Sequence, residues 1–210
     1  MVKVVTAANR DRFKPLLDSM FRDRKRVFVD KFKWNVPVVD EVLEKDQFDN
    51  DDAVYLIVAD PETGLHMGSA RMLPTTGPHL LKDVFPTLCE GEMPIGDDVW
   101  EVTRMCTSPD LKKDIDPRGV RRSITIAFVE FAILYGATRL TLLAHMEYLS
   151  RILALGWECR PLGIPKELNG QLMGAMEISI TPATLQTVRM LFAGGVRTPL
   201  LELEGITRAA

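Results

Sequence analysis

The sequence predicts an α/β fold, with helices packed over a mixed β-sheet. Stretches rich in β-branched and aromatic residues alternate with stretches whose apolar residues recur at helical spacing, which is typical of this fold class. The 210 residues contain no long linker, internal repeat or low-complexity segment. We therefore expect a single domain over residues 1–210.

The first half of the chain is expected to form a strand, a helix and a hairpin. The helix is indicated by an apolar stripe, and the hairpin by the Asp-Pro and Gly of the run DPETG between two apolar stretches. A polar, irregular run separates the helix from the hairpin. The expected bounds are a strand at 2–7, a helix at 12–31, the irregular run at 35–52, and hairpin strands at 53–59 and 65–73.

The second half continues the alternation after a loop-rich section. Gly136 and Gly156 follow two of its helices, and Thr181 followed by Pro182 is a typical helix start. The expected strands cover 100–106, 139–144, 157–163 and 171–180, and the expected helices cover 120–135, 146–156 and 181–192.

Composition and charge narrow the function classes. The chain is 46% hydrophobic and 26% charged, with a net charge of −3, so it shows no global attraction to nucleic acid or an anionic membrane. Its start lacks the apolar run of a secretory signal, and no stretch approaches the roughly 18 apolar residues of a membrane span. Three scattered cysteines suit reduced thiols, and the three histidines are isolated. We expect a cytoplasmic protein without a metal site.

The strand WEVTRMC carries two charges that a sheet interior would not need. Glu101 and Arg104 are three residues apart, so in a regular strand they would point to opposite faces. If both serve one site, the strand must deviate from regular geometry. We therefore expect an irregularity near residues 103–106 that also exposes backbone N–H donors.

Arg71 also lies in an apolar strand, where an unpaired guanidinium would cost several kcal/mol. It therefore requires a carboxylate partner. Six charges in unusual positions sum to zero, which is consistent with one neutral cluster, although a solvated surface would explain the loop aspartates and Arg24 individually. These residues are Arg24, Asp46, Asp49, Arg71, Glu101 and Arg104.

These residues resemble the signature of the acyl-homoserine-lactone synthases, the autoinducer synthases of bacterial quorum sensing. The family shows Arg–x3–Phe–x5–Trp, then Asp–x2–Asp, an Arg ending an SxR strand, and Glu–x2–Arg. The matching residues here are Arg24, Phe28, Trp34, Asp46, Asp49, Arg71, Glu101 and Arg104. Gly156-Trp157 and the Leu162-Gly163-x-Pro165 turn extend the resemblance more weakly.

The resemblance implies a fold like that of the GNAT acetyltransferases, in three layers with a splayed central sheet. It also implies two substrates and no prosthetic group. One is S-adenosylmethionine, and the other is an acyl thioester on acyl carrier protein or coenzyme A. The thioester acylates the methionine amine, and the carboxylate then closes a lactone and releases methylthioadenosine.

We place Glu101, Arg71 and Arg104 at the catalytic centre. Glu101 is a candidate base acting through water, because the α-amine, with a pKa of about 7.7–8.0, needs little help to lose its proton. An equal alternative is that Glu101 only holds the two arginines. Among the substrate-binding candidates, Arg24 or Arg104 would orient the carboxylate, Asp46 and Asp49 would meet the ammonium or fix the arginines, and Phe28 and Trp34 would face the adenine or the sulfonium.

The acyl chain needs an apolar slot, which we expect from the second half of the chain. The candidates are Met105, Thr141, Leu143, Met146, Leu149, Ile152, Leu153 and Met173. Most of them would pack a core equally well. In the family, Thr at the position matching Thr141 is associated with 3-oxo-acyl chains, which the local match supports only weakly.

Several arginines could grip the phosphate of coenzyme A or an acidic carrier protein. The run RGVRRS opens a helix, where anions bind well, but it departs from the acetyltransferase phosphate-binding pattern. The candidates are Arg118, Arg121, Arg122 and Arg151, with Arg139 and Arg160 as possible extensions. Ordinary surface solubility explains them equally well, so the donor stays open.

Two other functions compete with the synthase. One is an ordinary N-acetyltransferase that uses acetyl-coenzyme A on a small amine, and the other is a non-enzymatic domain that binds a nucleotide-like ligand. The incomplete phosphate loop argues against the first, and the complete charged signature argues against the second. Acyl chain length, oligomeric state and the cognate receptor are not indicated by the sequence.

Overall fold

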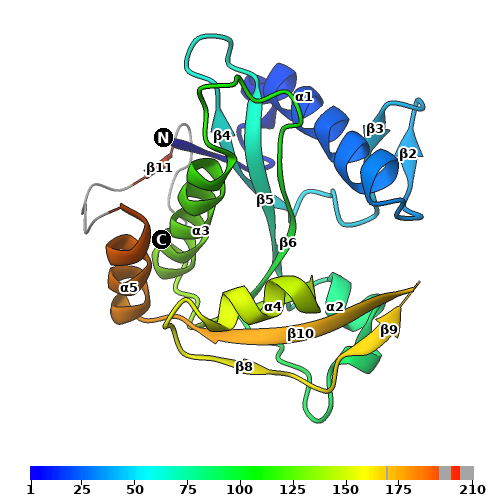
Figure 1. Cartoon of the computed structure of the whole chain (residues 1–210), viewed down its shortest axis with the longest axis vertical. Helices are drawn as coiled ribbons and strands as arrows, with labels where there is room; N and C mark the ends of the chain where they lie inside the picture. Colours follow the sequence, from blue (N-terminus) through cyan, green and yellow to red (C-terminus); the bar gives the residue numbers. More distant parts are fainter. Residues whose placement is uncertain (169, 194–199, 204–210) are drawn as a thin grey trace. The chain divides into compact units, whose positions relative to one another are not determined.

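The computed structural model describes residues 1–168, 170–193 and 200–203. Within them the chain divides into two compact units (Figure 1). Unit 1 consists of residues 1–71, 104–127 and 200–203, and unit 2 consists of residues 72–103 with the described residues of 128–193. The expectation of a single domain over residues 1–210 stays a prediction.

Unit 1 contains a sheet with strand order β11–β1–β4–β5–β6. β1 pairs antiparallel with β4 and parallel with β11, so the sheet is mixed as expected. The strands are β1 (Val2–Val5), β4 (Val54–Ala59), β5 (His66–Pro74), β6 (Val99–Thr107) and β11 (Leu201–Glu202). The last residues of β5 and the first residues of β6 belong to unit 2.

The expected hairpin turn joins β4 to β5. The Asp60 carboxylate accepts hydrogen bonds from the backbone N–H groups of Glu62 and Thr63, and Gly64 adopts a φ of 71° that favours glycine. The Asp60 N–H closes the turn on the Leu65 carbonyl at 2.8 Å. The turn predicted from DPETG is therefore confirmed.

The expected helix of residues 12–31 is present but has three parts. A 3₁₀ turn, η1 (Arg10–Phe13), leads into α1 (Lys14–Arg24), which continues as the π-helical segment η2 (Lys25–Lys31). π-helical turns are rare and are frequent at functional sites. After η2 the run expected to be irregular contains a small hairpin, β2 (Val38–Val39) and β3 (Leu43–Glu44), which lies beside α1 (Figure 1).

The helix α3 (Pro117–Leu134) starts in unit 1 and packs closely on β5 there. A Cβ built on Gly68 would lie 2.5 Å from the Val120 side chain and 3.2 Å from the Cys106 carbonyl oxygen. Position 68 therefore requires glycine for close approach. α3 begins three residues earlier than expected.

Unit 2 contains the strand order β6–β7–β10–β8, with β9 also paired to β10. The parallel pairing of β6 with β7 runs only from Val99↔Arg139 to Val102↔Leu142, whereas β7 continues to His145 against β10. The remaining elements are α2 (Leu80–Asp83), η3 (Pro86–Leu88), β7 (Arg139–His145), α4 (Met146–Leu153), β8 (Cys159–Pro161), β9 (Lys166–Leu168), β10 (Gln171–Ser179) and α5 (Pro182–Ala193).

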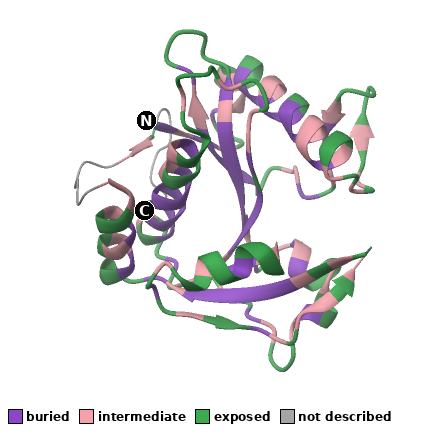
Figure 2. Ribbon diagram, in the orientation of Figure 1, coloured by how far each residue is buried: buried purple, intermediate pink, exposed green. Residues whose placement is uncertain are grey.

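In unit 2 the strand β10 is buried over most of its length (Figure 2). The helix α4 lies on this strand, because Gly174 leaves room for Leu149 and Met146. The expected cap of α5 is confirmed, since the Thr184 N–H donates to the Thr181 hydroxyl at 3.2 Å. Leu81, Leu88, Leu162 and Ala175 form a buried apolar cluster, called here the apolar cluster of unit 2.

Candidate active site

Three arginines and three carboxylates alternate in a closed ring within unit 1. Each guanidinium contacts two carboxylates and each carboxylate contacts two guanidiniums, with distances between 2.5 and 2.9 Å for five of the contacts and 3.0 Å for the Arg104–Glu44 contact. We call this arrangement the charged ring. In order around the ring its members are Arg24, Glu44, Arg104, Asp46, Arg71 and Asp49.

Arg24, the last residue of α1, contacts two of the carboxylates. Its Nη1 and Nη2 donate to the two oxygens of Asp49 at 2.8 and 2.9 Å, and its Nε donates to Glu44 at 2.5 Å. The paired bonds to Asp49 use the planar fork of the guanidinium, which gives strong and directional recognition. Arg24 is only 1% exposed. The simple reading of Arg24 as part of a solvated basic run is therefore wrong.

Arg71 satisfies the expectation that it needs a carboxylate partner. Its Nη1 and Nη2 donate to Asp46 at 2.6 and 3.1 Å, and Nη1 also lies 2.9 Å from Asp49. The residue is buried on β5. The loop aspartates are thus the counter-charges of a buried arginine, and they are themselves nearly inaccessible to water.

Arg104 lies at the expected irregularity of β6. Its φ of 51° is in the left-handed region, which non-glycine residues rarely adopt. From there its Nε donates to Glu44 at 3.1 Å and its Nη2 to Asp46 at 2.7 Å. The backbone irregularity is therefore confirmed, and it coincides with a residue of the charged ring.

The loop that carries the two aspartates is fastened by the same carboxylates. Asp46 accepts the Phe48 N–H at 2.9 Å, and Asp49 accepts the Asp46 N–H at 2.9 Å. The Tyr55 hydroxyl on β4 donates to Asp49 at 3.0 Å. Each aspartate therefore binds backbone and arginine at once, which fixes the loop against α1 and the strands.

The charges of the ring sum to zero, and the pKa values of two of its members are set by their partners more than by burial. Burial alone would raise the pKa of Asp49, but Arg24 and Arg71 lower it well below its ordinary value. Burial would lower the pKa of Arg24, but Asp49 and Glu44 raise it. Burial and the neighbouring Asp49 raise the pKa of Tyr55, so its hydroxyl stays protonated and can donate.

Phe28 and Trp34 form an aromatic pair beside the ring. Their rings are stacked, with centroids 4.8 Å apart. The backbone N–H of Trp34 donates to the backbone carbonyl of Phe28 at 2.8 Å. The Arg104 guanidinium carbon lies 5.5 Å from the Phe28 centroid and 5.9 Å from that of Trp34, within cation–π range. Phe28 is buried and Trp34 half-buried, so packing and ligand binding are both compatible with Phe28.

Glu44 is the ring member that the sequence pattern does not predict. It lies in β3, opposite Val38, and is fully buried, although it belongs to a run of acidic residues that is typical of a solvated loop. The one available signal is its position two residues before Asp46, which places both on one side of an extended chain. A third carboxylate is expected from the charge balance, but the sequence favours Glu101 for that position.

Glu101 lies in unit 2, fully buried on β6. Its two carboxylate oxygens accept hydrogen bonds from the backbone N–H groups of Leu80 and Leu81, at 2.8 and 2.7 Å, at the start of the short helix α2. Within unit 2 Glu101 therefore acts as an anchor for this turn. Its roles as a base and as a partner of Arg71 and Arg104 stay predictions.

The acyl-pocket candidates in unit 2 differ in their surroundings. Leu143 and Met173 pack against the apolar cluster of unit 2. Leu149 is buried, whereas Met146 and Leu153 are exposed and Ile152 is intermediate. Thr141 is fully buried, and its Oγ1 has no hydrogen-bond partner among the described residues. Met105 is 37% exposed and belongs to unit 1.

The carrier-binding candidates are exposed side chains. Arg118, Arg121 and Arg122 lie on the first turns of α3 in unit 1, and Arg151 lies on α4 in unit 2. The Asp116 carboxylate accepts the Arg118 backbone N–H at 2.9 Å. One of the backbone N–H groups that could bind a phosphate at this helix start is therefore already bonded within the protein. Arg139 and Arg160, the possible additions to this set, both pair with Glu177, which partly neutralises their positive charge.

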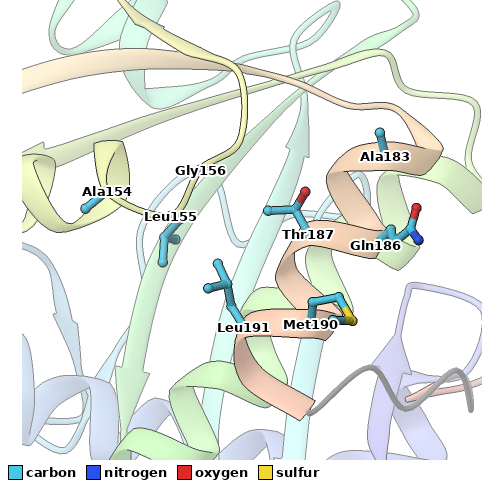
Figure 3. Close-up of a pocket in the computed structure, with 8 residues that line it drawn as sticks. All are labelled: Ala154, Leu155, Gly156, Ala183, Gln186, Thr187, Met190 and Leu191. Carbon is cyan, nitrogen blue, oxygen red and sulfur yellow. The ribbon is translucent and has the colours of Figure 1, made fainter.

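Unit 2 also contains a shallow hollow of about 480 Å³ between the end of α4 and α5 (Figure 3). Its lining includes Leu155, Thr187, Met190 and Leu191 and none of the residues assigned to the site from the sequence. Across the described residues no helix combines the length and the hydropathy that a membrane span requires.

Comparison with known proteins identifies the family. The autoinducer synthase family model matches residues 9–186. An acyl-homoserine-lactone synthase of Ralstonia solanacearum is 32% identical over 186 residues, which cover 85% of this chain and 89% of the relative. Among solved structures, TofI in a ternary complex with an inhibitor and methylthioadenosine (MTA) is 31% identical, with a TM-score of 0.75, covering 90% of this chain and 96% of that chain.

A second solved structure shows the fold. BjaI, a coenzyme A-dependent acyl-homoserine lactone synthase with S-adenosylmethionine and isopentyl-CoA, aligns with a TM-score of 0.87 at 24% identity, over 99% of this chain and 94% of that chain. The expected GNAT-like α/β fold is confirmed. This chain belongs to the autoinducer synthase family, whose enzymes are acyltransferases that make acyl-homoserine lactones.

Proposed function

We propose that the charged ring and the aromatic pair of unit 1 bind S-adenosylmethionine, and that the chain converts it to an acyl-homoserine lactone. The observation that carries the assignment is the ring itself: five of its six members are signature positions of the family, and they meet in one neutral cluster. The family match sets aside the simple N-acetyltransferase and the non-enzymatic alternatives.

The chemistry of S-adenosylmethionine suits this cluster. The substrate carries an α-carboxylate, an α-ammonium and a sulfonium, so it needs donors, acceptors and an electron-rich surface at fixed positions. Arg104 is the most accessible of the ring arginines, at 9% exposed, and it already touches Phe28 and Trp34. Arg104 would orient the carboxylate, while the aromatic pair would face the sulfonium or the adenine, a contact of about 0.5–2 kcal/mol.

The reaction proceeds in two balanced steps. The α-amine loses a proton and attacks the thioester carbonyl, and the thiol of the carrier leaves with a proton, so an amide forms. The α-carboxylate then attacks the γ-carbon, the C–S bond breaks, and methylthioadenosine leaves with the electron pair that neutralises the sulfonium. The second step is intramolecular, so holding the carboxylate near the γ-carbon provides most of the acceleration.

Glu101 is our candidate for moving the first proton, through a water molecule. Backbone N–H groups near the irregular residue Arg104 are the candidates for stabilising the oxyanion of the first step. The acyl chain would lie against Leu143, Met173 and Thr141, whose buried hydroxyl has unused hydrogen-bonding capacity among the described residues. The exposed arginines of α3 and α4 would meet coenzyme A or acyl carrier protein. We propose the cytoplasm as the location of the reaction.

The activity is tested with purified protein, S-adenosylmethionine and a panel of acyl-coenzyme A and acyl-carrier-protein thioesters. Mass spectrometry should detect methylthioadenosine and an acyl-homoserine lactone in equal amounts. Acylation without methylthioadenosine would indicate an N-acyltransferase instead, and absence of turnover with every donor would contradict the synthase assignment.

The binding site is tested separately with Arg104→Lys, which keeps the positive charge but loses the guanidinium fork. We expect a KM for S-adenosylmethionine roughly tenfold higher, with the KM for the acyl donor nearly unchanged. Arg22→Lys on the exposed face of α1 is the matched control and should leave S-adenosylmethionine use unaltered. Unchanged kinetics in Arg104→Lys would remove Arg104 from the substrate site.

A further inference from the structure

A buried chain of hydrogen bonds lies in unit 1 next to the charged ring. The His66 Nδ1 is 2.8 Å from an Asp23 oxygen, and the His66 Nε2 is 3.0 Å from the Ser69 Oγ. The Ser69 hydroxyl is also hydrogen-bonded to Cys106. We call Asp23, His66, Ser69 and Cys106 the buried relay. All four residues are at most 7% exposed.

The order Asp–His–Ser has the connectivity of a hydrolase triad, but burial excludes that role. Ser69 is 1% exposed and the His66 side chain is inaccessible, so an acyl group cannot reach the hydroxyl. Burial raises the pKa of the Cys106 thiol to about 12, which leaves it protonated and unreactive. Any contribution of the relay to function must therefore come from fixing the positions of neighbouring groups.

The chemistry of its members fixes one end of the relay. The Asp23 carboxylate only accepts, so the His66 Nδ1 donates to it. The Ser69 hydroxyl in turn bonds both the His66 Nε2 and Cys106. The four side chains are therefore linked in one continuous hydrogen-bonded network, whose bonds reinforce one another.

Every segment that carries a ring arginine also carries a member of the relay. Asp23 precedes Arg24 on α1, Ser69 lies two residues before Arg71 on β5, and Cys106 lies two residues after Arg104 on β6. Moreover, the His66 N–H donates to the Ser19 Oγ at 3.0 Å, one turn before Asp23. His66 thus holds the start of β5 to α1 through both its backbone and its ring.

We propose that the buried relay is a positioning network that sets the relative placement of Arg24, Arg71 and Arg104 for binding S-adenosylmethionine. This inference rests on the function proposed for the charged ring. Stability alone does not account for the relay, because buried polar groups replaced by apolar groups of similar volume often leave stability unchanged or raise it. A network kept for geometry should instead affect substrate binding more than folding.

The test is the triple variant Asp23→Leu/His66→Phe/Ser69→Ala, which replaces the polar side chains by apolar ones of comparable shape. We expect a melting temperature equal to or above that of the unaltered protein. The KM for S-adenosylmethionine should rise about tenfold, because small displacements of binding groups are costly, while the KM for the acyl donor stays within about twofold. An unchanged KM for S-adenosylmethionine would overturn the proposal, and so would a fall in melting temperature with equal loss of all kinetic parameters.

Two further variants separate geometry from general perturbation. Asp23→Asn keeps an oxygen that accepts the His66 Nδ1–H, so it should restore near-normal binding; if it behaves like the triple variant, the hydrogen bond is not what matters. Lys112→Gln removes an exposed ion pair with Glu62 in the same unit and serves as the control. Should the triple variant fail to fold, Ser69→Ala alone must still raise the KM for S-adenosylmethionine severalfold, or the proposal fails.

Failure of the inference is distinguishable from failure of the proposed function. Calorimetric titration of the unaltered protein with S-adenosylmethionine tests the function, since no binding would contradict the role of the ring itself. Hydrogen exchange of the Arg24 and Arg104 Nε–H groups, measured by NMR without ligand, tests the relay independently. We expect faster exchange in the triple variant, and equal exchange would contradict the positioning role.

Discussion

The buried charges assigned to the site are compensated differently in the two units. In unit 1 six charged side chains from α1, β3, the following loop, β5 and β6 neutralise one another in the charged ring. In unit 2 the carboxylate of Glu101 is held by backbone N–H groups, and the nearby interior contains leucines and an alanine. A polar, zwitterionic substrate suits the first environment, and an acyl chain suits the second. The contrast predicts that the ring depends on all its members, whereas apolar positions should tolerate exchange for residues of similar volume.

The largest effect should come from removing one charge of the ring. Arg71→Met leaves Asp46 and Asp49 buried without their shared partner, and breaking a buried pair costs roughly 3–5 kcal/mol. We expect that loss of unfolding free energy in urea, together with loss of lactone synthesis. In unit 2 the same replacement at Arg160, whose side chain is 64% exposed beside Glu177, should cost less than about 1 kcal/mol. Similar costs at both positions would contradict the contrast between the units.

Glu101→Gln should give the next largest effect. If Glu101 assists proton transfer, turnover should fall by roughly 10²–10⁴. The structure adds a stability cost of about 1–3 kcal/mol, because the amide NH2 that replaces one carboxylate oxygen cannot accept the backbone N–H that this oxygen binds. Glu130→Gln, at a buried glutamate paired with Arg189, is the control that should lose stability but retain turnover. Full turnover in Glu101→Gln, measured as methylthioadenosine release, would remove Glu101 from the mechanism.

Much of the charged ring could be predicted from the sequence, because arginine in an apolar strand is costly enough to require partners. Arg71 and Arg104 therefore indicate nearby carboxylates through their sequence context alone. Glu44 could not be predicted in this way, because its burial depends on the β2–β3 hairpin. The turn residues of that hairpin, Asp40 and Glu41, adopt φ values of 49° and 62°. No glycine or asparagine marks that turn, so the pattern resembles an irregular loop.

The apolar candidates could not be predicted with the same certainty, for a physical reason. Leucine and methionine lining a substrate slot and those packing a core satisfy the same hydrophobic pattern. The structure distinguishes them only partly, placing Leu143 and Met173 beside the apolar cluster of unit 2 and leaving Met146 exposed. The π-helical geometry of η2 is likewise invisible in the sequence, since a helical stripe predicts a helix without fixing its hydrogen-bond register.

The charged ring should also make the acid stability of the protein depend on Asp49. Its pKa in the folded protein is lowered below the ordinary value of 3.8, because Arg24 and Arg71 outweigh burial. A lowered folded pKa contributes stability that is complete above the ordinary pKa and is lost as the pH falls toward the lowered value. We therefore expect the difference in unfolding free energy between the unaltered protein and Asp49→Asn to shrink as the pH falls from about 5 to about 2.5. A difference that stays constant over this range, followed by urea unfolding at each pH, would contradict the lowered pKa.

The smallest expected effect concerns a hydroxyl in each unit, and its sign should differ between them. Thr141 in unit 2 buries an Oγ1 without a partner among the described residues, whereas the buried Thr125 in unit 1 donates its hydroxyl to the Arg121 carbonyl at 3.0 Å. Thr→Val keeps the shape and removes the hydroxyl, so it should stabilise the free protein at position 141 and destabilise it at position 125, each by about 1 kcal/mol.

Kinetics then decide what the Thr141 hydroxyl is for. If it meets the acyl substrate, Thr141→Val should raise the KM for thioesters that carry a polar group near the carbonyl by a few-fold, since one neutral hydrogen bond is worth about 0.5–1.5 kcal/mol. The KM for unsubstituted chains should stay the same, because they carry no polar group that the hydroxyl could hydrogen-bond. A gain in stability with equal effects on both classes of donor would mean that the hydroxyl meets no substrate, and that acyl selection in unit 2 depends on the apolar side chains alone.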